Sequence, residues 1–103
     1  MTRRSGRNPD PTRVVAAQLG GTAERCVIGR GLTDDRALVE FGECLGPLPP
    51  RERQQALDYA TARYIDGHTD TAKAIVLLLA RAGADLDHAR AIHRERGNSF
   101  IVR

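Results

Sequence analysis

Aromatic residues are scarce in this chain of 103 residues: they make up 4% of it, and tryptophan is absent. A core with so few large rings must be built from Leu, Ile, Val and Ala. The scarcity also argues against a surface for single-stranded nucleic acid, because such surfaces stack bases on aromatic rings. The only aromatic side chains are those of Phe41, Phe100, Tyr59 and Tyr64.

Cysteine is equally scarce, since the chain contains only Cys26 and Cys44. Two cysteines cannot form a disulfide framework, and no CxxC motif is present that would indicate metal or redox chemistry. Both cysteines stand beside apolar residues in the sequence. We therefore predict buried free thiols rather than a disulfide between them.

Long apolar stretches are missing as well. The most apolar segment, residues 74–80, is far shorter than the ~20 residues that span a bilayer. The basic N-terminus is not followed by the apolar region of a secretory signal. We therefore expect a cytoplasmic protein with no membrane partner.

Patterns that indicate catalysis or metal binding are also missing. No serine or cysteine has the context of a nucleophile, and Gly29 and Gly31 are not followed by the Gly-Lys-Ser/Thr of a phosphate loop. His88 and His93 lie five residues apart, whereas two ligands on one helix face need a spacing of three or four. We expect no enzyme, no cofactor and no metal site, and no small-molecule substrate is evident.

Helical spacing of apolar residues predicts an all-α fold, a compact bundle of four to five short helices. The domain is expected over residues 12–103. Residues 1–11 contain Gly6, Pro9 and Pro11 with few apolar side chains, so we predict a disordered basic arm there.

Capping residues and helix-ending glycines predict where the helices begin and end. The first helix should begin at Thr12 and end at Gly20-Gly21. Residues 22–31 could form a strand or a helical turn, and the turn is favoured. Further helices are expected over residues 33–45, capped by Thr33, and over residues 50–66, 70–82 and 86–96.

Residues 74–80 are apolar on every side of the predicted helix 70–82. A helix that is apolar all round is buried all round, so this one should be the central helix of the bundle. Gly97-Asn98 should end the last helix, and residues 99–103 could then fold back on the core or pair as an edge strand.

The basic residues that have functional interest lie near the two ends. Residues 1–13 and 88–103 each carry four arginines against one acid, whereas the segment between them carries eight basic and eleven acidic side chains. A mildly acidic body with basic ends can hold a polyanion through those ends. The expected nucleic-acid-binding residues are Arg3, Arg4, Arg7, Arg13, Arg90, Arg94 and Arg96.

The sequence therefore favours a small non-enzymatic nucleic-acid-binding or regulatory protein that contacts duplex with little sequence specificity. Helix 70–82, a turn and helix 86–96 could also be read as a helix-turn-helix motif. Its recognition helix would present Asp87, His88, Arg90, His93 and Arg94.

The alternative prediction is a helical protein–protein interaction or assembly module, such as an adaptor, an inhibitor or a structural component of a larger particle. Its contact surface, for a partner or a second copy, would contain Leu38 and Phe41, or Val76, Leu77 and Ala80.

Overall fold

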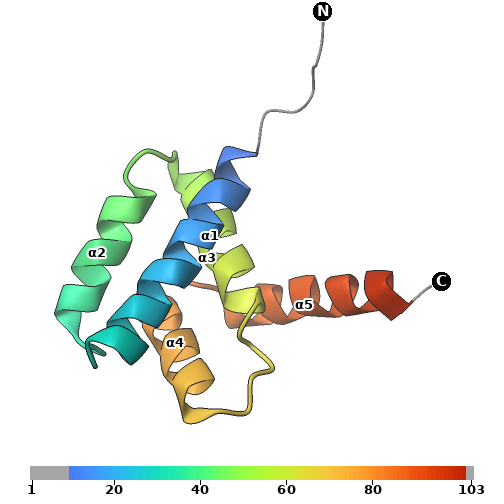
Figure 1. Cartoon of the computed structure of the whole chain (residues 1–103). Coiled ribbons are helices and arrows are strands. Elements are labelled where there is room, and N and C mark those ends of the chain that lie inside the picture. Colours follow the sequence, from blue (N-terminus) through green and yellow to red (C-terminus); the bar gives the residue numbers. More distant parts are fainter. Residues whose placement is uncertain (1–9, 102–103) are drawn as a thin grey trace, which may run out of the picture.

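A computed structural model of the chain describes residues 10–101 and the side chains of residues 10–96. Five α-helices follow one another, and the described residues form no strand, so the predicted all-α fold is confirmed (Figure 1). The elements are α1 (Pro11–Glu24), the π-helical turn η1 (Arg25–Gly29), α2 (Asp35–Leu45), α3 (Pro50–Ala62), α4 (Asp70–Arg81) and α5 (Leu86–Ile101).

Helices α1 and α3 form the centre of the bundle. They pack on each other more extensively than any other pair, α1 also contacts α2 and α4, and α3 also contacts α4 and α5. The largest fully buried side chains are Phe41, Leu19, Ile75, Leu78 and Leu79. The core is thus aliphatic except for one phenylalanine, as the composition predicted.

Helix α4 begins at Asp70 as predicted and ends at Arg81, one residue before the predicted end. Of the two capping residues that the sequence offers, Thr69 and Asp70, it is Thr69 whose hydroxyl accepts a hydrogen bond from the Ala72 N–H at 3.0 Å. The prediction that α4 is central and buried on all sides is wrong. Leu78 and Leu79 are buried, but the side chain of Leu77 is 63% exposed. A domain this small has too few helices to surround α4, so one side of it faces solvent although the sequence there is apolar.

The first helix differs from the prediction at both ends. Asp10 caps it, since its carboxylate accepts a hydrogen bond from the Thr12 N–H at 3.0 Å, and Pro11 is the first helical residue. Asp10 and Pro11 therefore belong to α1, and the rest of the predicted arm, residues 1–9, lies outside the described residues. Gly20 and Gly21 do not end the helix, which continues to Glu24 and then widens into η1.

Packing explains why a glycine stands inside α1. A Cβ built on Gly20 would lie 3.1 Å from the hydroxyl oxygen of Tyr64, which follows α3 in the chain. Glycine at this position lets the tyrosine approach the helix backbone closely. The helical turn favoured for residues 22–31 is confirmed by η1, and α2 is capped by Asp34 rather than by Thr33.

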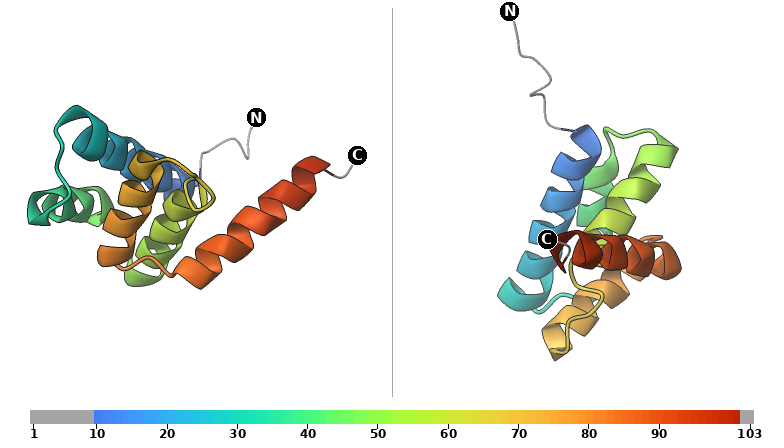
Figure 2. Two further views of the ribbon diagram at one scale, coloured as in Figure 1. Left: turned by 90° about the horizontal axis from the view of Figure 1, so that it is seen from below. Right: turned by 90° about the vertical axis from the view of Figure 1, so that its right-hand side faces the viewer.

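The predicted ends of α3, at residue 66, and of α5, at Gly97-Asn98, are also wrong. Helix α3 ends at Ala62, and turns follow through Asp66. Helix α5 passes through Gly97 and Asn98 and ends at Ile101, so residues 99–101 are helical and form no strand. Glycine in a helix costs only about 1 kcal/mol relative to alanine, which a continuing helix can tolerate. The C-terminal half of α5 projects beyond the other helices (Figure 2).

Two further predictions concern buried side chains. Cys26 and Cys44 are free thiols as predicted, although Cys44 is only half-buried. Phe41 is fully buried, so the expected contact surface of Leu38 and Phe41 is wrong, because its aromatic ring belongs to the core.

Tyr64 connects the chain after α3 to α1 through its hydroxyl. This hydroxyl donates a hydrogen bond to Glu24 Oε2 at 2.8 Å. Burial, and then the hydrogen bond to Glu24, raises the pKa of Tyr64 from its ordinary value of 10 to about 12.

We expect this pKa shift to make stability depend on pH in alkaline solution. The folded chain keeps the Tyr64 proton more tightly than the unfolded chain, so the contribution is complete below about pH 10 and is lost as the pH rises towards about 12. Urea unfolding across this range should show wild type losing stability relative to Tyr64→Phe. Parallel pH profiles for the two proteins would contradict the assignment.

Candidate nucleic-acid interface

The structure places the predicted basic residues on two helices. Arg3, Arg4 and Arg7 lie outside the described residues. Arg13 lies in the first turn of α1, and the remaining three, Arg90, Arg94 and Arg96, lie on α5. A common phosphate-binding surface therefore requires that α1 and α5 bring these arginines close together.

Arg13 lies across the side chain of Tyr59 on α3. Its guanidinium carbon is 5.1 Å from the centre of the tyrosine ring, a cation–π arrangement. Its Nε atom is also 4.0 Å from Asp10 Oδ2, but both side chains are more than half exposed, so this ion pair is weak. The ring of Tyr59 thus holds Arg13 over α3.

Arg96 meets Arg13 in a groove bounded by α1, α3 and α5. The groove has a volume of about 370 Å³, and we call it the α1/α3/α5 groove. Its walls are formed by Arg13, Gln55, Tyr59, His88, Ile92, Glu95 and Arg96. A small hollow next to it brings in Arg63 beside Arg13, Tyr59 and Arg96. Arg13 of α1, Arg63 of the turn after α3 and Arg96 of α5 therefore gather around Tyr59.

The other two predicted arginines lie outside the groove. Arg90 pairs with Asp87 one turn earlier in α5, with 3.3 Å between Nη1 and Oδ1. The Asp87 side chain is 98% exposed, so this ion pair has little strength and leaves Arg90 accessible. Arg94 is exposed on the same helix.

Asp58 is a buried acid that anchors α5 to α3. The residue is 1% exposed, and its carboxylate accepts hydrogen bonds from the backbone N–H of Asp85 at 2.8 Å and from the Gln54 side chain at 3.0 Å. Its Oδ2 atom lies 2.7 Å from His88 Nδ1. A buried carboxylate is costly unless it is fully hydrogen-bonded, and these contacts satisfy it.

Asp58 is a functional residue that the local sequence pattern does not reveal. Its contacts to Asp85 and His88 join residues about thirty positions apart, so no local pattern shows them. The sequence carried one weak signal: apolar Ala62 lies four residues after Asp58, and residues four apart in a helix share a face. The side chain of Asp85 caps α5, since it accepts a hydrogen bond from the His88 N–H at 3.2 Å.

The contacts of α5 contradict the helix-turn-helix reading. In that motif the recognition helix packs on the helix before it, whereas α5 packs mainly on α3. His93 Nδ1 lies 3.2 Å from the carbonyl oxygen of Ala62, and His93 Nε2 lies 2.8 Å from Asp66 Oδ2. His88 and His93 therefore attach α5 to α3 and the turn after it instead of reading bases.

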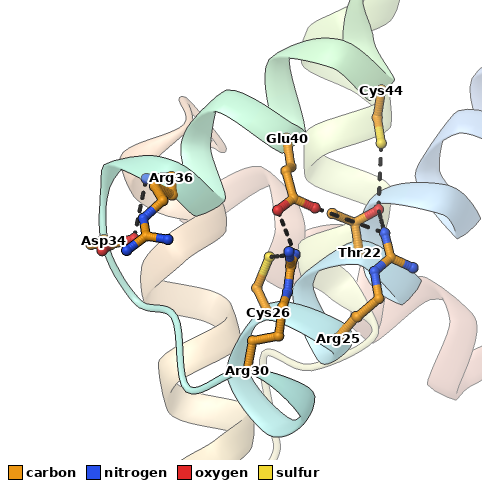
Figure 3. A network of polar contacts seen from close by, with 8 residues as sticks. All are labelled: Thr22, Arg25, Cys26, Arg30, Asp34, Arg36, Glu40 and Cys44. Carbon is orange, nitrogen blue, oxygen red and sulfur yellow. Dashed lines mark hydrogen bonds and ion pairs between the residues drawn. The ribbon is translucent and has the colours of Figure 1, made fainter.

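A second group of polar contacts joins η1 to α2 (Figure 3). Arg30 forms a short hydrogen-bonded ion pair with Glu40, which raises the pKa of Arg30. Arg25 lies 3.9 Å from the same carboxylate, and Arg30 Nη2 also lies 3.4 Å from Cys26 Sγ. Thr22 Oγ1 and Cys44 Sγ, drawn in the same view, are 3.4 Å apart.

These contacts show why the hollow beside η1 does not suit an anion, although at about 480 Å³ it is larger than the α1/α3/α5 groove. Glu40 and Glu43 line it with only one cation, Arg25. Glu40 already pairs with Arg25 and Arg30. The α1/α3/α5 groove suits an anion better, because two arginines, Arg13 and Arg96, line it with only one acid, Glu95.

Comparison with protein-family models, with curated proteins and with solved structures finds no match to this chain. In the part of the chain that the structure describes, no three potential metal ligands gather in one place. No described helix has the length and apolar character needed to cross a bilayer.

Proposed function

We propose that this protein is a small non-enzymatic nucleic-acid-binding or regulatory protein, which holds the phosphate backbone of a duplex. The observation that carries the proposal is the meeting of Arg13, from the basic N-terminal segment, with Arg96, from the basic C-terminal segment, in one groove. The contacting residues are those expected from the sequence together with Arg63. Two free thiols suit a reducing compartment, so we place this function in the cytoplasm.

The chain before α1 carries three more of the expected arginines. Arg7 is three residues from Asp10, so their Cα atoms are at most about 11 Å apart. Arg3 and Arg4 precede Arg7 by four and three residues. Asp10 caps α1, and Arg13 in its first turn lines the groove. Phosphate contacts of this kind position a protein on a duplex without reading its sequence.

The proposal predicts a defined loss of binding when the arginines are removed. A labelled duplex titrated at low salt should bind wild type, while Arg13→Gln/Arg96→Gln and Arg3→Gln/Arg4→Gln/Arg7→Gln should each bind about tenfold more weakly. Fluorescence anisotropy measures these affinities directly.

The matched control is Arg36→Gln/Lys73→Gln, which removes the same charge as the groove variant. Both residues are exposed on α2 and α4, and neither lines the α1/α3/α5 groove. This control should stay within about twofold of wild type. If the groove variant and the control bound the duplex with equal affinity, or if wild type did not bind it, the proposal would be contradicted.

A protein–protein interaction or assembly module is the second candidate, because four large apolar side chains are exposed among the described residues, and three of them are more than half exposed. Ile28 on η1 is 67% exposed, and Val39 on α2 and Leu77 on α4 are each 63% exposed. Exposed apolar groups can mark a contact surface for a partner or a second copy. Association that persists at high salt would favour this function over duplex binding.

A further inference from the structure

The α1/α3/α5 groove contains a histidine whose orientation is set by a buried acid. Asp58 is 1% exposed and lies 2.7 Å from Nδ1 of His88, which lines the groove. A carboxylate accepts the proton of the ring nitrogen that faces it, so Nδ1 is the donor to Asp58. Within the described residues, no hydrogen bond uses Nε2 of this ring.

Asp58 is itself held in place, so the ring of His88 has little freedom. The backbone N–H of Asp85 and the side chain of Gln54 both donate to Asp58 Oδ1. Gln54 also donates to the carbonyl oxygen of Gly83 at 2.9 Å. A ring fixed in this way presents Nε2 to a ligand without a further loss of side-chain entropy.

We propose that the α1/α3/α5 groove binds the terminal phosphate of a phosphomonoester, with Arg13, Arg96 and His88 Nε2 around it. This inference rests on the proposed function, because it names the chemical group that the same groove takes. The group is either the 5′ phosphate at the end of a nucleic-acid strand or the phosphate of a free nucleotide.

Charge and hydrogen-bonding capacity favour a terminal phosphate over one within the chain. A phosphomonoester carries a charge of about −1.5 to −2 near pH 7 and has three strong acceptor oxygens. A phosphodiester has one charge and two free oxygens. The groove offers two guanidinium groups from α1 and α5. Because Nδ1–H of His88 already faces Asp58, Nε2 is a further donor when the ring is an imidazolium, and this set is larger than a diester uses.

The other lining residues can receive the rest of such a ligand. Ile92 offers an apolar contact, and Gln55 and Glu95 can bond to hydroxyl and amino groups. A volume of about 370 Å³ falls in the range of small-ligand sites.

The test compares ligands that differ only in the terminal phosphate. A short duplex with 5′ phosphates and the same duplex with 5′ hydroxyls are titrated against wild type, and adenosine 5′-monophosphate is compared with adenosine by NMR. We expect the phosphate to strengthen duplex binding about tenfold, or the monophosphate alone to shift the resonances of His88, Gln55 and Ile92. A preference among duplexes identifies strand ends as the source, and binding of the monophosphate alone identifies a free nucleotide.

Variants test whether the preference for the phosphate arises in the α1/α3/α5 groove. His88→Ala and Arg96→Gln should each abolish the preference for the phosphate, and His68→Ala, which changes an exposed histidine in the loop before α4, should keep it. The second groove variant, Arg96→Gln, does not touch Asp58, so it tests the site even if His88→Ala fails to fold. A wild type that binds both duplexes equally and ignores the monophosphate overturns this inference and leaves duplex binding standing. Failure to bind either duplex overturns the proposed function instead.

Discussion

Leu79→Ala should destabilise the protein by about 2–5 kcal/mol, while Leu77→Ala on the same helix should change stability by less than about 0.5 kcal/mol. Leu79 is fully buried in the core, whereas Leu77 is 63% exposed. The first substitution loses transfer free energy and leaves a cavity, and the second removes atoms that already contact water. Urea unfolding of the three proteins measures both differences.

The pair of variants also tests where α4 lies. Both positions are leucine in the middle of one helix, so helix propensity changes equally in the two variants. Equal destabilisation by Leu77→Ala and Leu79→Ala would mean that α4 is buried on both sides and that the described packing is wrong.

Asp58→Ala should cost about 2–4 kcal/mol, because it removes a buried carboxylate that accepts from Asp85, Gln54 and His88. The loss frees the N-terminus of α5 from α3. Asp58→Asn, which keeps an acceptor oxygen for the Asp85 N–H, should cost less.

Asp87→Ala is the matched control for the loss of an acid. Its side chain is 98% exposed and contacts only Arg90 among the described ion pairs, so its removal should cost less than about 0.5 kcal/mol. Chemical denaturation gives all of these values. An Asp58→Ala variant as stable as Asp87→Ala would show that Asp58 does not hold α5 in place.

Local sequence signals predicted most of the helices well. Thr69 caps α4, and Gly83 ends it with a positive φ of 120°, a backbone conformation that favours glycine. These features depend on residues a few positions apart, which a sequence shows directly. The all-α fold followed from the same signals.

The errors arose where tertiary packing overrides a local signal. Gly20 looked like a helix end, but it stands inside α1 because Tyr64, 44 residues later, packs against it. The apolar run in α4 looked buried all round, but its surroundings depend on how many helices reach it.

The candidate site was predictable only in part. The charge pattern identified Arg13 and Arg96, yet their meeting depends on α5 lying across α3, which no local pattern in the chain shows. Arg63 and His88 join them through the same packing, and the residues that bury and bond Asp58 are likewise distant in the chain.

The salt dependence of duplex binding tests the central claim most directly. If all seven predicted arginines neutralise phosphates, the logarithm of the binding constant should fall linearly with the logarithm of salt concentration, with a slope of about −6. Arg13→Gln/Arg96→Gln should flatten the slope to about −4.5, and Arg36→Gln/Lys73→Gln should leave it unchanged. A wild-type slope shallower than about −2, or the same slope in the groove variant as in wild type, would contradict the account.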